Sequence, residues 1–140
     1  MMLPHINYLA VLVAGIAVFL LGGLWYSPPV FAKRWTALQG KTMEQMKAES
    51  AGSNIPLMYV SAFVCGLIVS WMLAAFMSHM GRQSLMIGAH VGALAWLGFV
   101  APTTYTTSLF SMRPKQLWLI DSLYWLVAFV VAGTIVGAWT

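Results

Sequence analysis

An uninterrupted apolar stretch from Leu85 to Phe110, LMIGAHVGALAWLGFVAPTTYTTSLF, constrains this chain more than any other feature. It contains no Asp, Glu, Lys or Arg, and it exceeds the roughly 20 residues that an α-helix needs to cross a bilayer. Charged residues make up 7% of the chain and hydrophobic residues 61%, whereas a soluble domain carries about 25% charged residues. Because so few charges could not cover a water-exposed surface, the sequence predicts an integral membrane protein.

Four apolar segments of spanning length follow one another, separated by shorter polar segments. This pattern predicts an all-α, polytopic membrane protein whose four transmembrane helices form a compact bundle, with a single domain over residues 1–140. The predicted spans are residues 5–27, 55–79, 85–110 and 116–139.

Segment 28–54 is the only sizeable polar part of the chain. Phe31, Trp35 and Leu38 share one helical face there, which predicts a short amphipathic helix at the membrane interface after the first span. Thr42 and Gln45 have the spacing of a capping box for a second short helix, and Asn54 is placed to cap the next span. Trp25, Tyr26 and Trp35 are predicted membrane-interface anchors, since amphipathic rings prefer the headgroup level.

The basic residues predict the orientation of the spans. Arg82 lies on one side of the predicted membrane, and the other six Lys and Arg residues lie on the opposite side: Lys33, Arg34, Lys41, Lys47, Arg113 and Lys115. By the positive-inside rule, both basic segments are cytoplasmic and both termini lie outside. The net charge of +4 resides in these segments, so we expect no nucleic-acid partner.

Asp121 is the most informative polar residue inside a predicted span. It lies six residues beyond Lys115, about 9 Å along a helix and therefore below the headgroups. A carboxyl group there costs at least ~2.5 kcal/mol, so we expect it to face protein or water. Counting depth along the third and fourth spans places Thr104 level with it. Two interpretations stay open: a structural acid, protonated or bonded to neighbouring hydroxyls, and a group that binds a proton or cation.

The third span supplies the other candidates for an intramembrane polar site. Pro102 cannot donate to the Gly98 carbonyl, so we expect a bend there, with Thr103 supplying a local donor. At about 100° per residue, one face of the span holds His90, Leu97, Ala101, Thr104 and Ser108. The opposite face holds Gly88, Gly92, Ala95 and Phe99. The candidate polar site therefore comprises Asp121, Thr104, Thr103, His90 and Pro102.

Small residues predict where helices approach closely. The predicted packing residues are Gly88, Gly92, Gly66, Gly133 and Gly137. They offer more close-packing faces than one small bundle can use, which predicts a homo-oligomer, a dimer or trimer. No spacing of His, Cys or carboxylates matches a metal site, so we expect no metal and no cofactor.

Several short motifs resemble those of a family of small bacterial integral membrane proteins, DUF1761, whose function is unknown. The motifs are NYLA at residues 7–10, LWYSP at 24–28, FAKRW at 31–35, WLGFV at 96–100, and GAW at 137–139. Ser111 departs from the pattern that the resemblance implies, because we expect an acid at that place in relatives. The resemblance implies four spans in a bacterial inner membrane, and it brings no catalytic residues. In such a membrane the outside location that the basic residues predict for both termini is the periplasm.

Two functional classes remain open. The first is a non-enzymatic membrane component that packs against lipid or another membrane protein. The alternative is a small proton- or cation-coupled transporter or channel for a small solute, with Asp121 as the titrating group. The chain contains no phosphate-binding glycine loop, nucleophile elbow or paired carboxylates, so we expect no enzymatic activity.

Overall fold

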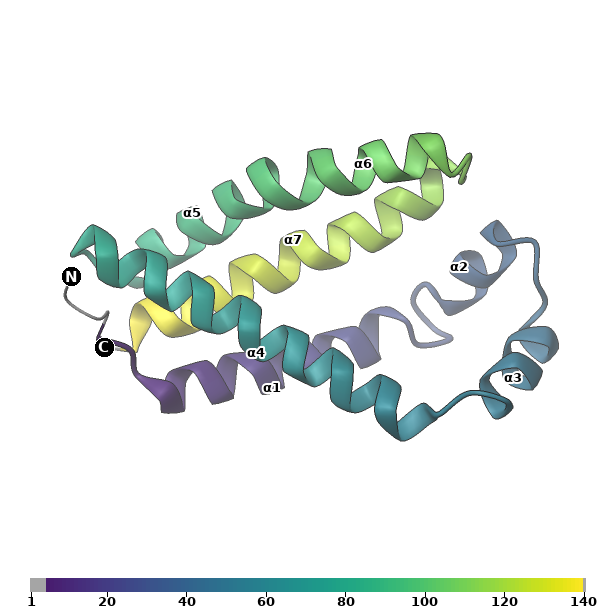
Figure 1. Ribbon diagram of the computed structural model, residues 1–140, viewed down its shortest axis with the longest axis horizontal. Coiled ribbons are helices and arrows are strands. Elements are labelled where there is room, and N and C mark those ends of the chain that lie inside the picture. Colours follow the sequence, from purple (N-terminus) through teal and green to yellow (C-terminus); the bar gives the residue numbers. More distant parts are fainter. Residues whose placement is uncertain (1–4, 140) are drawn as a thin grey trace.

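The computed structural model describes residues 5–139, and these residues fold into helices joined by short turns, which confirms the predicted all-α class (Figure 1). Four helical segments are long and apolar enough to cross a membrane. They are α1 (Tyr8–Trp25), α4 (Ile55–Met80), the continuous segment Leu85–Phe110, and α7 (Lys115–Ala138). The chain is therefore a multi-pass membrane protein.

The segment Leu85–Phe110 has three parts. It begins as α5 (Leu85–Ala95), passes through a π-helical turn, η1 (Trp96–Val100), and ends as α6 (Ala101–Phe110). A π-helical turn holds one residue more than the α-helical turn it replaces, so everything after it is rotated about the helix axis.

Two short helices connect α1 to α4, namely α2 (Ala32–Leu38) and α3 (Met43–Ala51). The predicted capping box of α3 is confirmed: Thr42 Oγ1 accepts from the Gln45 amide at 3.1 Å, and the Thr42 amide donates to Gln45 Oε1 at 2.8 Å. The predicted cap of α4 is also confirmed, because Asn54 Oδ1 accepts from the Leu57 amide at 3.1 Å.

The turns that connect the spans follow from local residue chemistry. Gly81 ends α4 with a left-handed backbone, at φ 69°, which a residue without Cβ adopts at low cost. Ser84 then caps α5 by accepting from the Ile87 amide at 3.1 Å. After α6 the chain reverses through Met112, which has a left-handed backbone at φ 54°, and Pro114, which directly precedes α7. Both turns are short, so each joins antiparallel neighbours.

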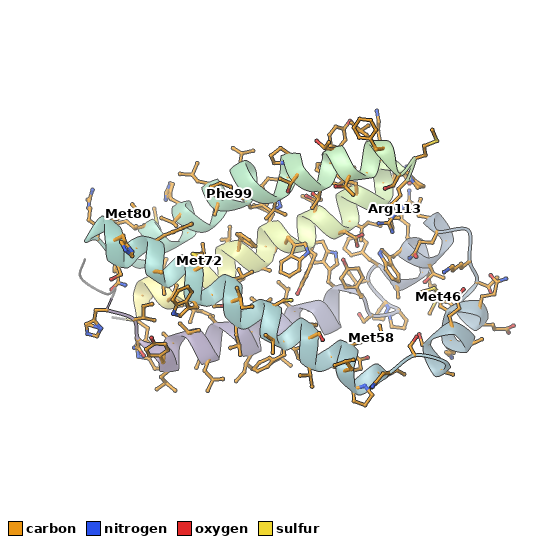
Figure 2. The ribbon with its side chains drawn as sticks, viewed as in Figure 1. Met46, Met58, Met72, Met80, Phe99 and Arg113 are labelled. Carbon is orange, nitrogen blue, oxygen red and sulfur yellow. The ribbon has the colours of Figure 1, made fainter. Side chains whose placement is uncertain are left out.

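Helix α7 lies at the centre of the arrangement and contacts α1, α2, α4, α5 and α6. Figure 1 shows α5 and α6 running beside α7, while α4 lies beside α1 and diverges from α6 toward the end that carries α2. His5, Arg82 and Trp139 line one shared pocket, so both ends of the described chain meet the α4–α5 turn. Figure 2 places Arg113 at the other end, near α2. The bundle is thus closed at the end with the termini and open at the end with the basic residues.

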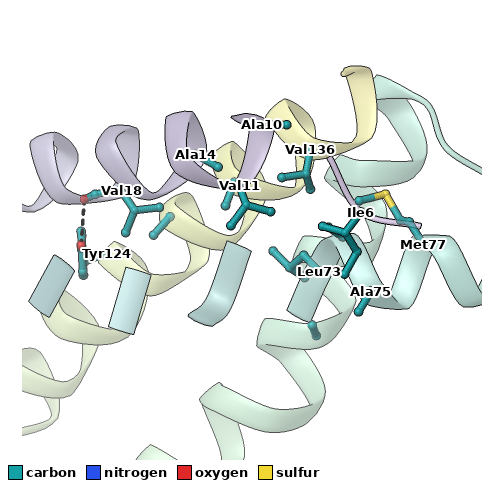
Figure 3. Packing of buried hydrophobic residues seen from close by; sticks show 14 residues of the cluster. Ile6, Ala10, Val11, Ala14, Val18, Leu73, Ala75, Met77, Tyr124 and Val136 are labelled. Atoms are coloured by element: carbon teal, nitrogen blue, oxygen red, sulfur yellow. Dashed lines mark hydrogen bonds between the residues drawn. The ribbon is translucent and has the colours of Figure 1, made fainter. Parts of the chain in front are cut away.

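The core fills the closed end of the bundle (Figure 3). Ile6, Val11, Leu73, Met77 and Val136 are buried there, contributed by the entry to α1 and by α1, α4 and α7. Toward the open end the core finishes at Tyr124, whose hydroxyl donates to the Val18 carbonyl at 3.0 Å. Dispersion contacts therefore hold one end of the bundle, and polar contacts begin where that core stops.

Glycines bring the helix backbones together at the closed end. A Cβ atom at Gly88 would overlap the carbonyl oxygen of Gly133, and one at Gly92 would overlap that of Phe129. A Cβ at Gly137 would likewise meet the Ser84 carbonyl. These contacts join α5 to α7 backbone to backbone, the geometry that small residues permit in a membrane.

Candidate functional site

Asp121 accepts two hydrogen bonds from the segment that follows α1. Its Oδ1 atom accepts from the Tyr26 hydroxyl at 2.6 Å and from the Trp35 indole Nε1 at 2.9 Å. The Asp121 side chain is half-buried. These partners differ from those we expected, because the Thr104 hydroxyl makes its hydrogen bonds elsewhere.

The local fold explains how two aromatic donors reach one carboxylate. Helix α1 ends at Trp25, and Pro28 and Pro29, which have no backbone N–H, follow directly. The chain then returns as α2, whose buried face sets Trp35 against α7. The Tyr26 and Trp35 rings meet edge to face, with centroids 5.5 Å apart. A buried Tyr or Trp requires a partner for its polar hydrogen, and Asp121 serves both.

Two further hydrogen bonds attach the same segment to α7. The Trp25 indole Nε1 donates to the Ile120 carbonyl at 3.0 Å. The Arg34 Nη2 donates to Gln116 Oε1 at 2.6 Å. All three predicted interface anchors, Trp25, Tyr26 and Trp35, therefore donate into the protein. We refer to this set of contacts between residues 25–35 and α7 as the aromatic clamp.

Tyr26 follows the last residue of α1, outside the four spans. Burial raises the pKa of its phenol well above the ordinary value, and the hydrogen bond to Asp121 adds to that rise. The phenol consequently keeps its proton and acts as a donor to the carboxylate.

On its other side, Asp121 lines a cavity of about 320 Å³ between α6 and α7. Hydroxyl, aromatic and charged side chains and one leucine line this cavity. They are Thr103, Thr104, Thr107, Ser108, Arg113, Leu117, Trp118, Asp121, Ser122 and Trp125. The structure thus brings three predicted site residues, Asp121, Thr104 and Thr103, to one cavity.

The threonine hydroxyls on α6 bond mainly to their own helix. Thr103 Oγ1 donates to the Phe99 carbonyl at 2.5 Å, and Thr104 Oγ1 donates to the Val100 carbonyl at 2.7 Å. These bonds satisfy carbonyls beside Pro102, which supplies no N–H of its own. Thr104 Oγ1 also accepts from the Trp118 indole at 3.0 Å, which links α6 to α7.

The π-helical turn explains why Thr104 faces α7. In an unbroken α-helix, Thr104 and Ser108 would lie opposite Gly88, as the face assignment from the sequence assumed. The structure instead directs both Gly88 and Thr104 toward α7. One extra residue rotates everything after it by about 100°. The same rotation turns Phe99 away from the glycine face, and its side chain is 67% exposed.

His90 and Pro102 lie outside the cavity. The His90 side chain is exposed, and its Nδ1 hydrogen-bonds with the Met86 carbonyl of its own helix at 2.8 Å. Fourteen residues separate it from Thr104, about 20 Å along the helix. Pro102 occupies the first turn of α6, and its side chain is exposed. Across residues 5–139, His, Cys, Asp and Glu form no group of three that could hold a metal ion.

The predicted packing glycines make their close contacts within one chain. Gly88 and Gly92 of α5 meet the α7 backbone around Gly133 and Gly137. A Cβ at Gly66 of α4 would lie 3.4 Å from the Val18 side chain of α1. The glycine faces that motivated an oligomer are therefore occupied by contacts inside the monomer.

The fold and the polar end together define a small four-span membrane protein with a carboxylate held between aromatic donors and a cavity. A scan of protein families matches residues 9–137 to the family described as a protein of unknown function, DUF1761. The match covers most of the chain, so the chain belongs to this family, in agreement with the resemblance of its motifs. Searches of curated proteins and of solved structures gave no match.

Proposed function

We propose that the protein is a non-enzymatic component of a bacterial inner membrane and that it engages anionic lipid through the exposed basic side of α2. The observation that carries this proposal is the aromatic clamp. Trp35 on the buried side of α2 is bonded to Asp121, and Lys33 and Arg34 on the same helix are exposed. A short helix fixed in this way presents its cations in one direction.

The distribution of charge supports this proposal. Lys41 and Lys47 follow α2 in the chain, and Arg113 and Lys115 lie at the α6–α7 turn on the same end of the bundle. Each Lys or Arg near an anionic membrane surface contributes about 1 kcal/mol of attraction. The positive-inside rule places this end in the cytoplasm and both termini in the periplasm. A C-terminal alkaline phosphatase fusion is then active, and a C-terminal green fluorescent fusion is dark.

Native mass spectrometry of the purified protein tests the lipid proposal. Wild-type protein is mixed with phosphatidylglycerol or phosphatidylcholine of identical chains, and the retained lipids are counted. We expect preferential retention of phosphatidylglycerol, reduced in Lys33→Gln, which removes one exposed charge of α2 and leaves the Arg34–Gln116 bond of the aromatic clamp in place. Arg82→Gln removes one charge at the opposite end and serves as the control. Equal retention of both lipids by wild-type protein would contradict the proposal.

The same spectra test the predicted dimer or trimer. Because the glycine faces are used within the chain, a second copy must contact other lipid-facing surfaces, such as the exposed side of α4. A monomer at every protein concentration, in detergent and in nanodiscs, would rule out the oligomer.

A second candidate function is ion-coupled transport. The cavity beside Asp121 favours it, since a carboxylate at this depth next to a polar cavity can bind and release a proton or cation. Flux of protons, sodium and potassium into liposomes is measured against pH for wild-type protein and Asp121→Asn. Loss of flux in Asp121→Asn is the expected result for a transporter. Wild-type flux no higher than that of empty liposomes eliminates this candidate.

A further inference from the structure

An unpartnered hydroxyl lies in the wall of the cavity between α6 and α7. Ser122 is 2% exposed and lines the cavity, and its Oγ has no hydrogen-bond partner among the residues that the structure describes. A buried hydroxyl without a partner is unfavourable, because it has lost its hydrogen bonds to water. Because the Oγ atom itself is buried, the Ser122 side chain must rotate toward the cavity before a bound group can bond to it and recover that cost.

The adjacent carboxylate also has unused capacity. Both donors to Asp121 reach Oδ1, and no residue in the described range 5–139 donates to Oδ2. The ion pair found in this range joins Lys41 to Glu49, far from the spans, so no protein cation neutralises Asp121. A charge inside a membrane is normally paired or directed into a cavity. Asp121 lines the cavity, so a ligand there can supply the missing cation.

Arg113 gives the cavity a second, opposite charge. It lies in the α6–α7 turn at the open end of the bundle (Figure 2), whereas Asp121 lies about 9 Å deeper than Lys115 along α7. A simple cation would neutralise the charge of Asp121 but leave the charge of Arg113 without a partner. A simple anion would pair with Arg113 but be repelled by Asp121. The two charges together favour a ligand with an anionic and a cationic group.

We propose that this cavity binds a small zwitterion that carries a primary ammonium and a phosphate or carboxylate. The ammonium bonds to Asp121 Oδ2 and Ser122 Oγ. Trp118 and Trp125 line the cavity about one turn before and after Asp121, and indole rings favour a nearby cation. The anionic group bonds to Arg113, which offers several donors in a planar fork.

The size of the cavity fits this ligand class. Its volume of about 320 Å³ lies at the lower end of the range for small-molecule sites, roughly 300–1,000 Å³. The ligand is either a free solute or the headgroup of a zwitterionic lipid, because both present the same two charges. This site is separate from Lys33 and Arg34 on α2, although Arg113 belongs to both the cavity and the basic end of the bundle. Asp121→Asn leaves every basic residue in place, so its effect on binding separates this proposal from the lipid proposal above.

Calorimetric titration of the purified protein in detergent tests the site. The ligands are phosphoethanolamine, which carries both charges, ethanolamine, which carries the ammonium, and inorganic phosphate. We expect saturable binding of phosphoethanolamine, about tenfold tighter than binding of either half, since each charge-assisted bond contributes. No saturable binding, or phosphate alone binding as tightly as phosphoethanolamine, would overturn the proposal.

Three variants assign the contacts. Asp121→Asn keeps an oxygen for Tyr26 and Trp35 and removes the charge, and we expect about tenfold weaker binding of phosphoethanolamine. Arg113→Gln changes an exposed turn residue and has a similar effect even if Asp121→Asn folds poorly. Glu44→Gln removes an exposed acid on α3 and binds like wild type. Unchanged binding in folded Asp121→Asn or in Arg113→Gln would refute the assignment.

Nanodiscs distinguish the two sources of the ligand. The titration is repeated in bilayers of phosphatidylethanolamine and in bilayers of phosphatidylglycerol. If the lipid headgroup is the natural ligand, phosphatidylethanolamine suppresses the binding of phosphoethanolamine several-fold. If a free solute is the ligand, binding is equal in both bilayers.

Discussion

The third and fourth spans meet in two different ways along one contact. At the closed end, α5 and α7 touch backbone to backbone through Gly88 and Gly133, and no space remains for a Cβ atom. At the open end, α6 and α7 are separated by a cavity of about 320 Å³ whose wall includes hydroxyls and two charges. The π-helical turn Trp96–Val100 separates the two regions.

The comparison shows what each region contributes. In lipid, burial from water does not drive helix pairing, so close glycine contacts supply the dispersion that holds the pair together. That support at one end allows the other end to keep an imperfectly packed polar space. The Trp96 indole, at the start of the π-helical turn, donates to the Ser122 carbonyl at 2.8 Å and fixes the point where the helices begin to separate.

The largest expected effect comes from filling the glycine contact. Gly88→Ala places a Cβ atom against the Gly133 carbonyl, which is backbone and cannot rotate away. We expect a loss of about 3 kcal/mol or more in the free energy of unfolding, at the upper end for overpacking. Unfolding in mixed micelles measures it.

Gly23→Ala is the matched control, because a Cβ built there has no atom within 4 Å apart from its chain neighbours and the nearby backbone of its own helix. A helical alanine is roughly 0.5–1 kcal/mol more favourable than glycine, so this variant should be as stable as wild type or slightly more so. Equal stability of Gly88→Ala and Gly23→Ala would show that the α5–α7 contact is looser than described.

Deletion of Gly98 should leave the direction of α6 unchanged. The π-helical turn holds one residue more than an α-helical turn, so removing that residue restores an α-helix in which Thr107 still lines the cavity and Thr106 does not. The single substitutions Thr107→Cys and Thr106→Cys, with Cys65→Ala as background, report the direction of α6 through their rates of reaction with a water-soluble maleimide. In the full-length chain we expect the Thr107→Cys thiol to react several-fold faster than the Thr106→Cys thiol, since Thr107 lines the cavity and Thr106 does not.

In the deletion variant the order of the two rates should stay the same. A reversed order would mean that α6 has rotated by about 100° and that the turn does not accommodate one extra residue.

The structural features that could be predicted from the sequence are those with a local cause. Hydropathy and span length predicted the four long helices, and Thr42 and Asn54 were identified as caps from their side chains alone. Glycine spacing identified the residues that bring α5 to α7. Each of these signals depends on neighbours within one or two helical turns.

The partners of Asp121 could not be found in the same way. Depth counting compared adjacent spans and selected Thr104, whereas Tyr26 and Trp35 arrive from a segment that the sequence assigned to the membrane surface. The missed signal was chemical: a Tyr hydroxyl and a Trp N–H need an acceptor when buried, and Asp121 is an acid nearby in depth. The π-helical turn had no signal beyond Gly98 and Pro102, so the faces of the third span after the turn, up to Phe110, were misassigned by about 100°.

A moderate effect is expected at the aromatic clamp. Asp121→Leu leaves the Tyr26 hydroxyl and the Trp35 indole without an acceptor, and we expect about 1–2 kcal/mol of lost stability. Asp121→Asn still offers an oxygen to both donors and should unfold close to wild type. Hydrogen exchange of the α2 amides should accelerate in Asp121→Leu and stay unchanged in Asp121→Asn. Protected α2 amides in Asp121→Leu would show that other contacts hold this helix.

The smallest effect is expected for single hydroxyls at the open end. Thr104→Val removes an acceptor from the Trp118 indole, and hydrogen bonds between membrane helices average about 0.6 kcal/mol. Thr106→Val is the control, because the Thr106 hydroxyl donates to the Pro102 carbonyl of its own helix at 2.8 Å and does not line the cavity. We expect Thr104→Val to lose about 0.6 kcal/mol and Thr106→Val to lose less. If Thr104→Val instead cost as much as Gly88→Ala, the open end would be as firmly packed as the closed one, and the contrast between the two regions would be wrong.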